Sequence, residues 1–132
     1  MQNSFILIAE NDSDDQLFFS TALREYNTEL KPMFFCNGEE LIRFLGDETN
    51  KMPVAIFLDL NMPKMNGLEA LLEIKRRPRY DHIPVIMIST TSNPFEINRC
   101  KKMGASDFVV KPNTFSQLSD SIKAALSCIE QC

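Results

Sequence analysis

The residues best suited to chemistry stand at the ends of apolar runs in the chain. In order they are Glu10, Asn11, Asp12, Asp59, Ser89, Thr90 and Lys111. Several carboxylates at one place repel each other unless a cation neutralises them. Oxygen ligands without His or Cys favour Mg²⁺ or a similar hard ion. A lysine and a hydroxyl beside such an ion would hold phosphoryl oxygens, and Asp59 would be the nucleophile that forms an aspartyl phosphate.

Each of these residues also has a plain structural interpretation. An aspartate such as Asp59 at a strand end is often a helix cap or a loop acid. Lys111 on its own is a solvated loop lysine, and Ser89 and Thr90 are common turn formers. The acidic residues between positions 10 and 15 suit the start of a helix. Only their joint placement at several strand ends favours the phosphoryl-transfer hypothesis.

The elements that would position these residues follow from the alternation of the sequence. Apolar runs begin near positions 5, 32, 54, 85 and 108, and amphipathic stretches lie between them. The runs are continuous rather than alternating, which is typical of strands buried on both faces. This pattern predicts βαβ units with right-handed crossovers. Ligands bind outside the carboxyl ends of such strands, where the residues above stand.

Local signals predict where the helices begin and end. Ser13 to Gln16 has the form of a capping box, and a second such box runs from Thr114 to Gln117. Asn-Gly pairs at 37–38 and 66–67 open two further helices, and a fourth runs from about Phe95 to Met103. The helix that opens at position 67 ends in three basic residues and Pro78.

Length and composition limit the class of protein. The 132 residues predict one domain over residues 1–132, with no output domain. A net charge of −4 disfavours direct nucleic-acid binding. No apolar run approaches the roughly 18 residues of a membrane span, and no signal peptide is evident, so a cytoplasmic protein is expected. The four cysteines form no C-x-x-C pair and His82 is the only histidine, which argues against a zinc site or a hydrolase triad.

Four stretches resemble the receiver domain of two-component response regulators, especially single-domain members similar to the chemotaxis regulator. They are FILIAENDSDD, FLDLNMPKMNGLEAL, PVIMISTTS and GASDFVVKP, in the order and at the spacing of that family. The resemblance covers essentially the whole chain. It implies the flavodoxin-like (βα)5 three-layer sandwich, an α/β fold whose parallel five-stranded sheet has the order 2-1-3-4-5.

The resemblance also implies a role for each site residue. Asp59 matches the phosphoacceptor, and the metal ligands are Glu10, Asn11, Asp59 and the carbonyl of Asn61 around Mg²⁺ or Mn²⁺. Ser89, Thr90 and Lys111 match the positions that contact the phosphoryl group. Ser89 and Phe108 match the conformational switch, and the Lys111–Pro112 peptide bond is expected to be cis. The donor would be a sensor histidine kinase or a phosphotransfer protein, and the output a contact with a protein effector.

Two positions depart from the family pattern. Asn11 stands where the family usually has an aspartate that binds the metal, so weaker metal binding is expected. Phe108 lacks the hydroxyl of the tyrosine that is common there. The first departure leaves open a pseudo-receiver that binds partners without phosphorylation. Resemblance therefore predicts a phosphoprotein rather than an enzyme, with no contact to nucleic acid or membrane, and a monomer or a dimer formed on phosphorylation.

Two rival functions also use an α/β sheet. A haloacid-dehalogenase-like phosphatase would have an acid two residues after its nucleophile, where this chain has Asn61. A flavodoxin would cradle a phosphate in its first loop with hydroxyls and backbone donors. The acids after the first run would repel that phosphate, which disfavours a flavodoxin. The amide of Asn61 disfavours the phosphatase.

Overall fold

The computed structural model describes residues 4–27 and 29–131, in which strands and helices alternate. The strands are β1 (Ser4–Ala9), β2 (Leu30–Phe35), β3 (Ala55–Asp59), β4 (Val85–Ser89) and β5 (Asp107–Val110). The helices are α1 (Ser13–Tyr26), α2 (Gly38–Gly46), α3 (Gly67–Lys75), α4 (Pro94–Lys102) and α5 (Phe115–Gln131). All neighbouring strands pair in parallel, in the order β2-β1-β3-β4-β5. The predicted fold and strand order are confirmed.

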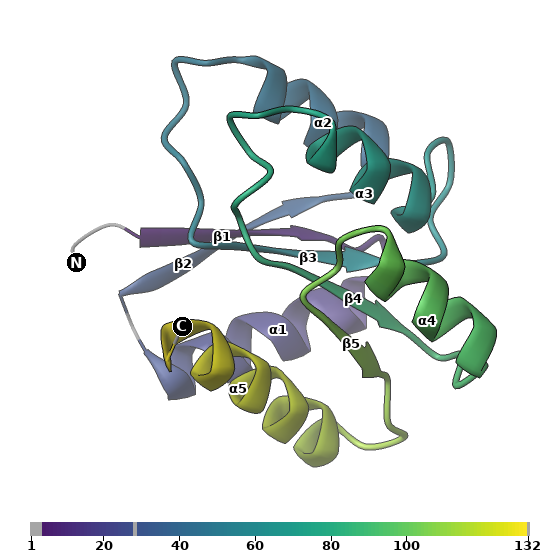
Figure 1. Ribbon diagram of the computed structural model, residues 1–132. Helices are drawn as coiled ribbons and strands as arrows, with labels where there is room; N and C mark the ends of the chain where they lie inside the picture. Colours follow the sequence, from purple (N-terminus) through teal and green to yellow (C-terminus); the bar gives the residue numbers. More distant parts are fainter. Residues whose placement is uncertain (1–3, 28, 132) are drawn as a thin grey trace.

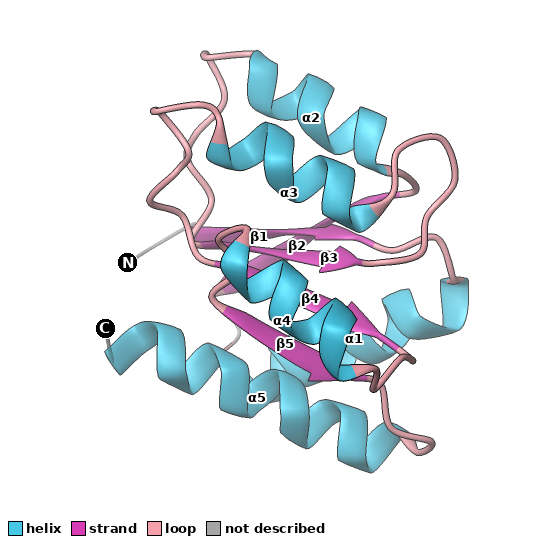
Figure 2. Cartoon of the chain, turned by 45° about the vertical axis from the view of Figure 1, so that its right-hand side comes forward, coloured by secondary structure: helices cyan, strands magenta, loops and turns pink. Residues whose placement is uncertain are grey.

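Helices cover both faces of the sheet (Figures 1 and 2). Helices α1 and α5 pack on one face, where Phe19 and Ile122 are fully buried against Ile8 and Phe57. Helices α2, α3 and α4 cover the other face, where Leu41 and Leu71 belong to a second buried cluster. The continuous apolar runs are explained by this arrangement, since every residue of β3 and β4 is buried.

The caps of the helices agree with the sequence at most ends. Asn37 and Asn66 cap α2 and α3 as predicted, and Asn66 forms a complete capping box with Glu69. The prediction for α1 is wrong by one residue. Its N-cap is Asp12, whose carboxylate accepts hydrogen bonds from the N–H groups of Asp14 and Asp15. Aspartate is as good a cap as serine, and here it comes first along the chain.

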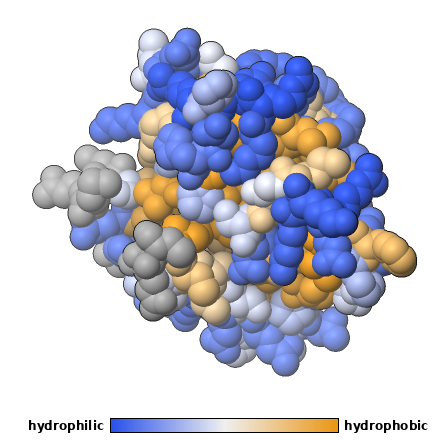
Figure 3. Space-filling view, viewed as in Figure 1, coloured by the Kyte–Doolittle hydropathy of each residue, from blue (hydrophilic) through white to orange (hydrophobic). Residues whose placement is uncertain are grey.

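The surface seen in Figure 3 is mainly hydrophilic, with apolar side chains showing between the helices. The most exposed large apolar side chain is that of Phe95, at the start of α4, which is 86% exposed among the described residues. No helix of the described ranges is both long and apolar enough to cross a membrane. Cys36, Cys100 and Cys128 are free thiols, whereas Cys132 lies outside the described residues.

Candidate functional site

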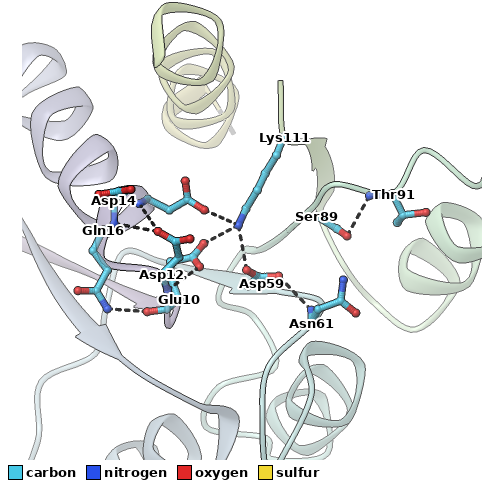
Figure 4. Close-up of polar contacts among 10 residues, drawn as sticks. Glu10, Asp12, Asp14, Gln16, Asp59, Asn61, Ser89, Thr91 and Lys111 are labelled. Atoms are coloured by element: carbon cyan, nitrogen blue, oxygen red, sulfur yellow. Dashed lines mark hydrogen bonds and ion pairs between the residues drawn. The ribbon is translucent and has the colours of Figure 1, made fainter. Parts of the chain in front are cut away.

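The carboxyl ends of four strands bring the predicted chemical residues together. Asp59 is the last residue of β3 and Ser89 the last of β4. Glu10 follows β1 directly, and Lys111 follows β5. Figure 4 shows the Lys111 side chain reaching from the end of β5 toward Glu10 and Asp59. Parallel pairing alone produces this gathering, because the carboxyl ends of all the strands lie at one edge of the sheet.

The ammonium of Lys111 is the centre of the site. Its Nζ lies 2.8 Å from Glu10 Oε1, 2.8 Å from Asp15 Oδ2 and 2.9 Å from Asp59 Oδ2. These are charge-assisted hydrogen bonds, and together they use the three N–H donors of the ammonium. Burial by itself would lower the pKa of Lys111, but the bonds to Asp15, Glu10 and Asp59 raise it above its usual value. Lys111 is therefore a fixed cation among carboxylates.

Both carboxylate oxygens of Asp59 are engaged. Oδ2 accepts from Lys111, and Oδ1 accepts a hydrogen bond from the backbone N–H of Asn61 at 3.0 Å. The residue is only 6% exposed. The carboxylate is therefore held at both of its oxygens, by the ammonium after β5 and by the backbone of the loop after β3.

Glu10 is the most deeply buried acid of the site, at 1% exposure. Burial raises its pKa to about 7, and the negative charge of Asp59 adds to that rise, while Lys111 and the N–H of Asp12 oppose it. Its backbone carbonyl accepts a hydrogen bond of 2.6 Å from the Gln16 side chain. The backbone of Glu10 is thus held by α1, and its carboxyl group is protonated more readily than that of an ordinary glutamate.

The hydroxyl of Ser89 is buried and already accepts one hydrogen bond, from the N–H of Thr91 at 3.2 Å. Thr90 is exposed and lines a cavity of about 260 Å³ that Lys111 also lines. Phe108 is partly buried against the core on the α3 side of the sheet. Ser89 and Thr90 thus border the site, whereas Phe108 lies within β5 and packs against the core.

Asn11 and Asn61 are exposed beside these carboxylates. Asp12 gives no substitute carboxylate for position 11, because its side chain caps α1. No group of three or more His, Cys, Asp or Glu residues in the described ranges has the arrangement of a metal site. The available donors are nevertheless carboxylate, amide and carbonyl oxygens, which are the ligands that Mg²⁺ and Mn²⁺ take. The residues present therefore fit a hard divalent cation.

Comparison with known proteins decides the family. The model of the response regulator receiver domain matches residues 6–123, most of the chain. The chain belongs to this family. Receiver domains act in two-component signalling, bind a divalent metal and are not generally classed as enzymes. Membership implies a histidine kinase as partner.

Individual relatives support the assignment over nearly the whole receiver. The two-component response regulator ORR5 of Oryza sativa subsp. japonica is 32% identical over 114 residues, which are 86% of this chain and 82% of the relative. The Mn²⁺-bound response regulator Rcp1 is 25% identical with a TM-score of 0.86, covering 94% of this chain and 92% of that one. The phosphorylated cyanobacterial phytochrome response regulator RcpA is 29% identical with a TM-score of 0.86, covering 93% and 91%.

The peptide bond between Lys111 and Pro112 corrects one expectation. It was expected to be cis, and the described residues of this receiver contain no cis peptide bond. Trans is the lower-energy isomer even before proline.

Asp15 is the contact that the sequence analysis missed. Its carboxylate was interpreted as helix-start charge, yet it binds Lys111. The helical period contains the missing indication. Asp15 precedes the buried Phe19 by four residues and the buried Ala22 by seven, so it lies on the inward stripe of α1. Asp14, its neighbour, is exposed.

Proposed function

We propose that this receiver accepts a phosphoryl group on Asp59 from a phosphohistidine of a sensor histidine kinase or a phosphotransfer protein. An oxygen of Asp59 attacks phosphorus, a P–O bond forms and the P–N bond to the imidazole breaks. The imidazole leaves with the electron pair of that bond and takes a proton from water. The product is an aspartyl phosphate.

One observation carries the proposal above all. The Lys111 ammonium lies 2.9 Å from Asp59 Oδ2, and the buried Ser89 hydroxyl stands at the end of the neighbouring strand. The ammonium therefore contacts the carboxylate that would attack, and the hydroxyl belongs to the adjacent strand of the sheet. Phosphoryl transfer depends mainly on positioning and charge stabilisation, which fixed donors supply. Thr90 is exposed and shares a cavity with Lys111, so the donor would approach the ammonium from this side.

The metal would be held by Glu10, Asn11, Asp59 and the backbone carbonyl of Asn61. A bound Mg²⁺ or Mn²⁺ supplies charge neutralisation to the phosphoryl oxygens. The related Rcp1 structure is Mn²⁺-bound, which supports a cation of this type. Asn11 contributes an oxygen without charge, so this chain offers less negative charge to the ion than an aspartate there would.

The output is proposed to be a change in the face made by α4, β5 and α5. Ser89 and Lys111 move toward the new oxygens, and Phe108 repacks in the space that this motion frees. Phe95 and Val110 are the exposed large apolar side chains of α4 and β5. A protein effector would bind this face, with the receiver as a monomer or as a dimer formed on phosphorylation. A coupling free energy of about 1–3 kcal/mol between phosphorylation and this conformational change is sufficient to shift the population toward the changed state.

Asn11 favours one alternative, a pseudo-receiver that binds partners in its unphosphorylated form. Both functions are compared by intact-protein mass after incubation with acetyl phosphate, in Mg²⁺ and in EDTA. The proposal predicts a Mg²⁺-dependent gain of one phosphoryl group in the wild type and none in Asp59→Asn. If the wild type gains no mass at any Mg²⁺ concentration while Asn11→Asp does, the pseudo-receiver is the better account.

A further inference from the structure

The acidic start of α1 contains three carboxylates, and only one of them meets the site. Asp12 is used by the helix cap and Asp14 is exposed. Asp15 binds Lys111 Nζ at 2.8 Å, as close as the buried Glu10 does. Its side chain is 21% exposed, against 1% for Glu10 and 9% for Asp59. Asp15 is therefore the outermost of the three partners of the ammonium.

The net charge of the site matches that of a divalent cation, with opposite sign, only when Asp15 is counted. The Lys111 ammonium contacts Glu10 and Asp59, the two carboxylates that would bind a divalent ion. Like charges repel, so the ammonium opposes the approach of that ion. If Lys111 pairs with Asp15, one positive and one negative charge cancel. A carboxylate that binds a metal is deprotonated, so Glu10 and Asp59 then present two negative charges to a doubly charged cation.

We propose that Asp15 is a positioning residue, which by binding the Lys111 ammonium at the outer side of the site offsets its charge and allows a divalent cation to bind Glu10 and Asp59 despite the neutral Asn11. This inference rests on the proposed function, since it concerns the metal of the same site. Asp15 touches neither phosphorus nor the ion in this role and acts through Lys111. It takes over part of the electrostatic contribution that a carboxylate at position 11 would make.

The test is the Mg²⁺ affinity of the full chain, measured by calorimetry without any phosphodonor. Loss of one nearby unit charge weakens the binding of a divalent ion by about 3-fold or more. Asp15→Asn should weaken Mg²⁺ binding by this factor, whereas Asp15→Glu should bind within about 3-fold of the wild type. Asp14→Asn is the matched control, because it removes the same charge from the same helical turn without a contact to Lys111. It should change the affinity by less than about 3-fold.

A double-mutant cycle decides whether Asp15 acts through Lys111. Lys111→Gln removes the competing cation and should tighten Mg²⁺ binding. Asp15→Asn added to Lys111→Gln should then weaken Mg²⁺ binding by a smaller factor than it does in the wild type, since no ammonium remains for Asp15 to position. Circular dichroism establishes that each variant is folded. If Lys111→Gln does not fold, the comparison among Asp15→Asn, Asp15→Glu and Asp14→Asn decides.

The proposal is overturned by any of four results. The first is a wild type that binds no Mg²⁺, and the second is Mg²⁺ binding by Asp15→Asn that equals the wild type. The third is an equal loss in Asp14→Asn, which would mean a general effect of surface charge. The fourth is an undiminished loss in the Lys111→Gln background. Because no phosphodonor is present, these results are independent of whether Asp59 accepts a phosphoryl group.

Discussion

At the scale of single residues, the site is defined by acids that surround one ammonium. Three carboxylates contact Lys111, and each differs in burial. Glu10 is the innermost, and its raised pKa of about 7 means that the fold favours its protonated form. Lys111 and the neighbouring acids thus form an electrostatic unit in which the loss of any member alters the others.

The raised pKa of Glu10 predicts a particular pH dependence of stability. A carboxyl whose folded pKa exceeds its unfolded value stabilises the fold below the unfolded pKa, and this contribution is lost as pH rises through the folded pKa. Between pH 4.5 and about 7 the unfolding free energy of the wild type should therefore fall relative to that of Glu10→Gln. The relative change should be about 1–3 kcal/mol. Urea unfolding in EDTA at several pH values measures it, and parallel pH curves would contradict it.

Asn11 predicts a metal requirement that one substitution relieves. Asn11→Asp adds a carboxylate beside Glu10 and should lower the Mg²⁺ concentration for half-maximal phosphorylation by about 3- to 30-fold. Rates with acetyl phosphate over a range of Mg²⁺ concentrations give the value. Asn11→Ser, which adds no charge, serves as the control. An unchanged Mg²⁺ requirement in Asn11→Asp would show that position 11 does not contribute charge to the site.

At the scale of elements, the start of α3 fixes the position of the Asp59 backbone. A Cβ on Gly67 would lie 2.4 Å from the carbonyl oxygen of Asp59 and 2.8 Å from Cα of Leu60. Gly67 N–H also donates to the carbonyl of Leu60 at 3.0 Å. Helix α3 therefore begins in direct contact with the end of β3, and only glycine permits this approach.

Substitution of Gly67 tests that contact. Gly67→Ala should lower the unfolding free energy by about 1–3 kcal/mol, because backbone atoms must shift to admit the methyl group. It should also slow phosphorylation, since the shift occurs at Asp59. Gly46→Ala is the matched control in α2, where a Cβ meets nothing within 4 Å, and it should alter stability by less than about 1 kcal/mol. Denaturant unfolding of both variants measures the difference. Equal effects would argue against the contact.

At the scale of the molecule, the strands and most helix ends could be predicted because local patterns determine them. Continuous apolar runs indicated the buried β3 and β4, and the Asn66-Gly67 pair indicated the start of α3. The placement of Asp59 and Lys111 at one edge followed from parallel pairing. The strand order did not, since it depends on packing between distant elements and was taken from a resemblance.

The details that escaped prediction depend on tertiary contacts or on small energy differences. The bond from Asp15 to Lys111 joins residues 96 positions apart in the chain. The choice between Asp12 and Ser13 as N-cap involves residues of nearly equal capping strength. The positive φ of Lys64, 65°, occurs in the loop after β3 at a residue type that gives no sign of it. The trans isomer of the bond before Pro112 is also a detail that depends on a small energy difference.

Coupling between the site and distant elements predicts which segments change their hydrogen exchange on phosphorylation. Acetyl phosphate with Mg²⁺ should alter hydrogen exchange in peptides that cover residues 94–110, because in the proposed function motions of Ser89 and Phe108 change α4 and β5. Residues 38–46, which form α2, should exchange as before. Exchange measured by mass spectrometry on the wild type and Asp59→Asn gives the comparison. A change of equal size in Asp59→Asn would show that phosphorylation is not its cause.

The central claim is that Asp59 is the phosphoacceptor, and borohydride trapping tests it most directly. Borohydride reduces an acyl phosphate to an alcohol, so a phosphorylated aspartate becomes homoserine. After treatment with acetyl phosphate and Mg²⁺, peptide mass spectrometry should find homoserine at position 59, and none when Mg²⁺ is replaced by EDTA. Homoserine at another aspartate, with position 59 unmodified, would contradict the assignment.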